Sequence, residues 1–128
     1  MLTGGCLCGA VTFEADEIAK DYRACHCTAC RKVSGHYWSA SHVPSALFRL
    51  TEDRGLRGFQ SSDGAERGFC CEIGSSLFFR MHDRDGVEVA PGAIDGPTGM
   101  TLTGHIYVHD KGDYYDLDDG LPQFEAGT

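Results

Sequence analysis

The sequence predicts a mainly β fold, built from many short strands with one short helix. Seventeen glycines in 128 residues favour a turn-rich chain over a helical bundle, because glycine adopts the backbone conformations that tight turns require. Apolar residues occur in short runs bounded by glycine, proline and polar residues, as is typical of short strands. Hydrophobic residues make up 41% of the chain, enough for a folded core.

The length predicts a single domain over residues 1–128. The formal charge of −8 argues against a general nucleic-acid binder, which needs cations to neutralise phosphates. Residues 1–10 show no secretory signal, and no segment approaches the ~20 apolar residues of a membrane span. Seven cysteines are an odd number, so full pairing is excluded. We expect a cytoplasmic protein with reduced thiols, no membrane or nucleic-acid partner, and homodimerisation left open.

The first half of the chain alternates strands with cysteine-containing turns. Residues 4–13 are expected to form a metal knuckle that runs into a strand, since Val11 and Phe13 alternate as a half-buried strand requires. A helix of one or two turns is expected over residues 28–33, ended by Gly35. Pro44 stops the strand predicted before it. Further strands are expected in this half at residues 22–24, 38–43, 48–50 and 56–60.

The second half contains one strongly apolar strand and two weaker ones. Strands are expected at residues 77–79, 87–90 and 105–108, with glycine- and proline-containing turns between them. The acidic tail over residues 113–124 contains aromatic and leucine side chains that favour docking onto the sheet.

The stretch at residues 25–32 indicates a metal site. Cys25, Cys27 and Cys30 have the spacing C-x-C-x-x-C, which allows three thiolates to converge on one ion from a knuckle and the first turn of a helix. Zinc with four protein ligands is usually structural, whereas zinc with three keeps a position for chemistry. The alternative to metal binding is that the three cysteines are only packed in the core as small hydrophobic side chains. A disulfide is disfavoured, because cysteines two residues apart meet its geometry poorly.

A second pair of cysteines precedes the first expected strand. Cys6 and Cys8 are spaced to point the same way along an extended backbone. Two thiolates make half of a tetrahedral site, so the other half must come from elsewhere in the chain.

Three segments, in this order and at these separations, resemble the glutathione-dependent formaldehyde-activating enzyme family, which also includes centromere protein V. They are residues 5–9 (GCLCG), residues 25–35 (CHCTACR, ending at glycine) and residues 69–77 (FC, leading to GSSL). Residues 104–108 and 121–124 resemble the C-terminal signature of the same family. The resemblance implies several short coiled antiparallel β-sheets built around zinc-binding knuckles.

The resemblance also implies two zinc ions. Cys25, Cys27 and Cys30 correspond to the catalytic ligands, and Cys6, Cys8, Cys70 and residue 73 to the structural ones. Position 73 is isoleucine, which cannot bind zinc, so the second zinc is in doubt.

Five candidates for the missing ligand remain open. Water, His82, His105 or His109 would complete the shell, as would Cys71 if the knuckle were rearranged. A site with only three thiolates would bind metal more weakly, and without metal its cysteines would be buried or oxidisable thiols.

The implied reaction joins a small thiol to a small aldehyde, glutathione plus formaldehyde giving S-hydroxymethylglutathione, so the protein would be a zinc-dependent carbon–sulfur lyase. A tris-thiolate zinc centre suits this, because it is a weak Lewis acid that accepts a soft sulfur ligand. Arg31 and Lys32 are candidates to bind a substrate carboxylate, with a solvated basic helix face as the alternative. His26 is a candidate proton shuttle or a histidine held by the backbone.

Two other functions remain open at this point. A non-catalytic zinc-bearing module would bind a thiol ligand or a protein partner without turnover. A zinc-ribbon nucleic-acid binder is disfavoured by the acidic balance and the absence of a basic aromatic stripe.

Overall fold

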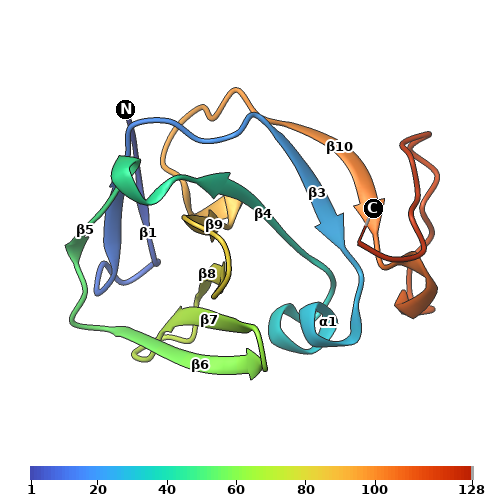
Figure 1. The fold of residues 1–128 in the computed structure, drawn as a ribbon, viewed down its shortest axis with the longest axis horizontal. Helices are drawn as coiled ribbons and strands as arrows, with labels where there is room; N and C mark the ends of the chain where they lie inside the picture. The colour runs from blue at the N-terminus through green and yellow to red at the C-terminus, as the bar shows by residue number, and fades with distance from the viewer. Residues whose placement is uncertain (128) are drawn as a thin grey trace.

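The computed structural model describes residues 1–127, and it confirms the mainly β fold. Two sheets and a single α-helix, α1 (Thr28–Ser34), form the regular structure (Figure 1). Among residues 1–127, no helix has the length and apolar character to cross a bilayer. The strands are β1 (Leu2–Gly5), β2 (Thr12–Ala15), β3 (Asp21–Cys25), β4 (Trp38–Val43), β5 (Phe48–Glu52), β6 (Leu56–Ser62), β7 (Ala65–Cys70), β8 (Ser76–Met81), β9 (Val87–Val89) and β10 (Thr101–Ile106).

The smaller sheet has the strand order β1-β2-β5, and the larger one the order β10-β3-β4-β9-β8-β7-β6. All neighbouring pairs are antiparallel except β10 and β3, which run parallel; the prediction of antiparallel sheets did not include that pair. The larger sheet curves round from β10 to β6, with α1 near the end of β3 and the C-terminal tail beyond β10 (Figure 1).

Most predicted elements lie where the sequence placed them. Strand β4 occupies its predicted residues, and the helix ends at Gly35, whose φ of 89° is the left-handed conformation that glycine favours. The strand predicted at residues 105–108 is wrong for its last two residues. There Tyr107 has a φ of 55° and residues Val108–Asp110 form a 3₁₀ turn, so β10 ends at Ile106.

The hydrophobic core lies where the two sheets face each other. Phe13 of β2, Phe48 of β5 and Phe78 of β8 form a triangle with ring centroids 5.5–5.6 Å apart. Aromatic pairs at this separation add stabilisation beyond their buried area. The core also includes Cys70 at the end of β7, so one end of the second cysteine group is fixed by packing.

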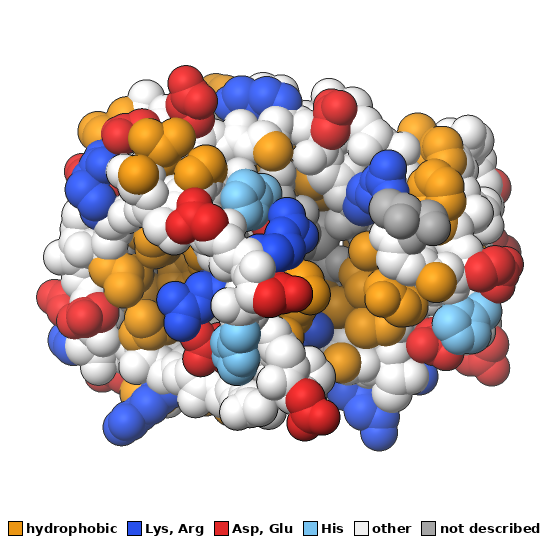
Figure 2. All heavy atoms as spheres, in the orientation of Figure 1, with side chains coloured by type: hydrophobic (Ala, Val, Ile, Leu, Met, Phe, Trp, Pro, Cys, Tyr) orange, Lys and Arg blue, Asp and Glu red, His pale blue; other side chains and the backbone are white. Residues whose placement is uncertain are grey.

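Acidic and basic side chains are interspersed over the face in Figure 2, and hydrophobic side chains lie recessed between them. A cavity of about 800 Å³ lies between the β3–β4 and β7–β8 parts of the larger sheet. The start of α1 and strand β7 both line this cavity, and the site described next lies in its wall.

Candidate metal centre

The three cysteines of the C-x-C-x-x-C stretch lie together, and we call them the first cluster. Cys25 is the last residue of β3, Cys27 is the N-cap of α1, and Cys30 lies in the first turn of the helix. Their Sγ atoms all lie within 4.8 Å of one another. The strand delivers one sulfur and the helix turn brings back the other two, which explains why the spacing produces convergence.

Hydrogen bonds hold the first cluster in this arrangement. The backbone N–H of Cys30 donates to Sγ of Cys27 over 3.4 Å, which satisfies one of the free donors at the helix start. Beside Cys25, the backbone N–H of His26 donates to the carbonyl of Ile106 over 3.0 Å. The segment between the first two cysteines is therefore attached to β10.

The three thiols share their protons unequally. Hydrogen bonds from Cys25 and Cys30 lower the pKa of Cys27 to about 2, so Cys27 is the most acidic member. The bond that Cys25 makes to Cys27 raises the pKa of Cys25. The hydrogen bond with Cys25 lowers the pKa of Cys30, but the bond to Cys27 and burial outweigh it and the pKa is raised. A divalent ion would replace the two remaining protons.

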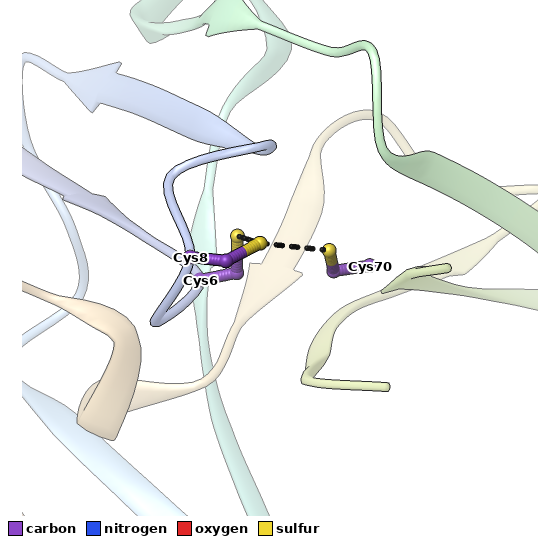
Figure 3. Close-up of side chains that lie close together, drawn as sticks. All are labelled: Cys6, Cys8 and Cys70. Atoms are coloured by element: carbon purple, nitrogen blue, oxygen red, sulfur yellow. Dashed lines mark hydrogen bonds between the residues drawn. The ribbon is translucent and has the colours of Figure 1, made fainter. Parts of the chain in front are cut away.

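A second cluster forms from Cys6, Cys8 and Cys70, which the structure brings together from distant parts of the chain (Figure 3). The Sγ atoms of Cys6 and Cys8 are 3.6 Å apart, and those of Cys8 and Cys70 are 3.7 Å apart. Sulfurs bound tetrahedrally to one zinc ion lie about 3.8 Å apart, given Zn–S bonds of about 2.3 Å. Disulfide sulfurs are about 2.0 Å apart, and all seven cysteines are free. The donor set of each cluster fits a soft divalent metal such as zinc.

Two turns position the second cluster. Gly9, with a φ of 81°, closes the loop that joins β1 to β2, and the N–H of Val11 donates to Sγ of Cys6 over 3.2 Å. Burial opposes ionisation of Cys6, but this donor and the neighbouring thiols outweigh it and lower its pKa to about 7. At the other side, the N–H of Gly74 donates to the carbonyl of Cys70.

Among residues 1–127, each cluster offers three candidate ligands, and no further cysteine, histidine or carboxylate joins either group. Cys71 is exposed and lies outside the second cluster. Ile73 is 47% exposed. His105 and His109 have hydrogen-bond partners elsewhere, and His82 is also outside both clusters. None of these four side chains completes the shell in this structure.

The three cysteines of the first cluster line this cavity. The three residues predicted to bind substrate do not. The cavity is lined by Cys25, Cys27, Cys30, Trp38, Arg67 and Phe79, among others. Arg31, Lys32 and His26 are not among its lining residues within the described chain. Lys32 is exposed and Arg31 is half-buried on α1. Substrate binding by these three residues stays a prediction.

His26 is fully buried and takes part in a hydrogen-bonded chain that the sequence did not reveal. Its Nε2 lies 2.9 Å from Nδ1 of His105, whose Nε2 lies 2.8 Å from Oδ2 of Asp119. Its Nδ1 is bonded to the hydroxyl of Tyr115. Burial lowers the pKa of His26 to about 4 and raises the pKa of Tyr115 to about 12. The imidazole is therefore neutral and the phenol protonated at neutral pH.

Sequence reasoning also missed Arg67, which lies on β7 and contacts the first cluster. Its Nη2 donates to Sγ of Cys30 over 3.4 Å. Ala65 and Arg67 are both buried and lie two positions apart on the strand, so their side chains point to the same face. A charged residue in register with an apolar one was the signal that could have indicated Arg67.

The family model described as glutathione-dependent formaldehyde-activating enzyme matches residues 1–110. An uncharacterized lyase of Schizosaccharomyces pombe is 28% identical over 121 residues, which cover 89% of this chain and 83% of that protein.

The fold also matches a solved structure. The crystal structure of a Rhodobacter sphaeroides protein superposes with a TM-score of 0.64 at 21% sequence identity, covering 94% of this chain and 98% of that one. At that identity the likeness concerns the fold. The family model, which spans most of the chain, decides the classification: this protein belongs to the glutathione-dependent formaldehyde-activating enzyme family.

Proposed function

We propose that this protein catalyses the reversible addition of a small thiol to a small aldehyde, with zinc held by Cys25, Cys27 and Cys30. The thiol and aldehyde of the family name, glutathione and formaldehyde, are the proposed substrates. The observation that carries the proposal is a cluster of three thiols in the wall of an 800 Å³ cavity with no fourth ligand from residues 1–127. A cavity of this volume lies in the range of small-molecule sites.

The reaction needs no redox partner. A bond forms between the sulfur of the thiol and the carbon of the aldehyde, and the proton lost by the thiol ends on the aldehyde oxygen. Zinc, when bound, supplies a soft position that favours the thiolate form of a substrate over the thiol. The second cluster, whose cysteines are not among the residues given for the cavity wall, is proposed to hold a zinc that joins the β1–β2 turn to the end of β7.

The chain itself contributes apolar walls beside the first cluster. Trp38 is buried and Phe79 is half-buried, and both line the cavity beside the first cluster. Apolar walls exclude water, which competes with a thiol for aldehyde carbon and weakens electrostatic interactions. His26 keeps both ring nitrogens engaged with Tyr115 and His105, which favours a role in holding the cysteine segment over proton transfer.

An exchange experiment tests the proposal. Glutathione and formaldehyde at equilibrium with their adduct are followed by exchange NMR, with and without the zinc-loaded protein. Wild type and Cys71→Ser, which alters a cysteine outside both clusters, should accelerate exchange, and Cys27→Ser should not. If the zinc-loaded wild type gives only the uncatalysed rate, a non-catalytic binding module becomes the better description.

A further inference from the structure

The side chain of Arg67 is an unusually isolated buried cation. It is 5% exposed, and its Nε and Nη1 atoms are buried without a hydrogen-bond partner. No carboxylate of residues 1–127 lies within ion-pair distance of it, although Asp and Glu outnumber Lys and Arg by 19 to 11 in the sequence. A buried charge without a counter-ion costs several kcal/mol, so this position requires an explanation.

The surroundings of Arg67 leave one candidate for its counter-ion. The guanidinium carbon lies 5.4 Å from the ring centroid of Trp38 and 5.0 Å from that of Phe79. The two rings contribute cation–π attraction but no negative charge. The remaining contact is Nη2 donating to Sγ of Cys30 over 3.4 Å, in the buried interior. An arginine keeps its proton in a protein, so the first cluster, which Arg67 contacts through Cys30, is the group that would balance its charge.

Charge balance at the first cluster supports the same assignment. Three thiolates around one divalent ion carry a net charge of −1, and one guanidinium brings the sum to zero. Hydrogen-bonded partners of metal ligands orient them and tune the metal. Arg67 belongs to β7, the strand that ends at Cys70 of the second cluster, so a rigid element holds the guanidinium against Cys30.

We propose that Arg67 is a positioning residue for the metal centre: its guanidinium holds Sγ of Cys30 in place through the Nη2 hydrogen bond and offsets the excess negative charge that three thiolates would carry around a divalent ion. The proposal rests on metal binding by the first cluster, which is part of the proposed function. It accounts for the buried cation and for its one hydrogen-bonded sulfur partner.

The test measures metal affinity in the full-length chain carrying Cys8→Ser, which removes an exposed ligand of the second cluster and leaves the first cluster to bind. Zinc affinity is determined by competition with a chromophoric chelator. Arg67→Gln should lower it by about 10- to 100-fold, the usual effect of removing the partner of a metal ligand. Arg84→Gln, which changes an exposed arginine lining the same cavity, should leave it unchanged within about twofold.

Cobalt substitution allows a second measurement, the energy of the thiolate-to-cobalt charge-transfer band, which a general loss of stability would not change. The thiolate-to-cobalt charge-transfer band should shift to lower energy in Arg67→Gln, because a sulfur that loses a hydrogen bond gives up electrons more easily. If Arg67→Gln does not fold, Arg67→Lys decides, since it keeps the charge but loses the planar fork. We then expect at least about threefold weaker zinc binding. Affinity and band position equal to those of the Cys8→Ser parent would overturn the proposal.

The outcome is independent of the proposed reaction. Loss of affinity in Arg67→Gln, together with no catalysed glutathione–formaldehyde exchange in wild type, would leave the role of Arg67 standing and reject the function. Catalysed exchange, together with unchanged metal affinity in Arg67→Gln, would reject the role of Arg67 and leave the function.

Discussion

Nε2 of His26 lies 2.9 Å from Nδ1 of His105, and this bond joins the segment between two cysteines of the first cluster to β10. Asp119 can only accept, so Nε2 of His105 donates to it. When both imidazoles are neutral, the remaining bonds have one direction: His26 donates to His105, and Tyr115 donates to Nδ1 of His26. The C-terminal tail therefore anchors the segment that carries the first cluster through side chains.

Removal of the hydroxyl at the end of this chain should destabilise the protein. Tyr115→Phe leaves Nδ1 of the buried His26 without its donor, and we expect a loss of about 1 kcal/mol in the free energy of unfolding. Tyr114→Phe is the matched control, because its hydroxyl donates to the carbonyl of His36 at an exposed position. Urea denaturation of both variants measures the difference. Equal stabilities for the two variants would argue against the hydrogen-bonded chain.

The His105–Asp119 hydrogen bond at the other end of the chain should give a pH dependence of known sign. The hydrogen bond from His105 holds the pKa of the Asp119 carboxyl below its ordinary value of 3.8. A lowered folded-state pKa means that the stabilisation is fully present above the unfolded pKa and is lost as the pH falls through the folded one. Wild type should therefore be more stable than Asp119→Asn at pH 7, and the difference should shrink toward zero below about pH 3.8.

Thermal melts of both proteins across this range measure that difference, and an NMR titration of the carboxyl gives its pKa directly. Asp118→Asn, one residue away, serves as the control and should show no such trend. A pKa of 3.8 or higher for Asp119 would contradict the assignment of the bond.

The elements that could be predicted from the sequence are those with local signals. Strand β4 has a proline directly after it, and α1 has a glycine at its end. Strand β1 was missed because Gly4 and Gly5 carry no side-chain pattern, and its pairing with β2 defines it. Strand β7 was missed because a glycine and two charged residues, one of them the buried Arg67, interrupt its apolar pattern.

The first cluster could be predicted because its ligands lie within six residues, so spacing alone brings them together. The contacts around it could not. His26 and His105 are 79 residues apart, and Arg67 is 37 residues from Cys30. Such pairs depend on which strands become neighbours, and no local periodicity contains that information. The second cluster spans 62 residues between Cys8 and Cys70, and family resemblance rather than spacing indicated it.

Metal analysis of cysteine variants should separate the two clusters. We expect two equivalents of zinc in the reduced wild type, one for each group of three cysteines. Cys27→Ser and Cys8→Ser should each lose one equivalent, because two remaining thiolates hold zinc poorly. Cys71→Ser should keep both. Elemental analysis after gel filtration measures the content, and full retention in Cys8→Ser would show that the second cluster does not bind zinc.

A designed ligand at position 73 should strengthen the second cluster. Ile73 lies in the turn that follows Cys70, and 47% of the residue is exposed, so its replacement leaves the core intact. Ile73→Cys restores the C-x-x-C spacing that the family resemblance leads us to expect, and a fourth thiolate closes a tetrahedral shell. Zinc affinity at this cluster should rise by at least about tenfold in a Cys27→Ser background, since metal binding adds directly to stability.

The control for this substitution is Ile73→Ser, which changes size and polarity in the same way without adding a thiolate. Cobalt-loaded Ile73→Cys should also show stronger visible absorption, as a four-sulfur tetrahedral site gives. Equal zinc affinity in Ile73→Cys and Ile73→Ser would mean that the turn directs residue 73 away from the cluster, so that solvent and not the protein completes the shell.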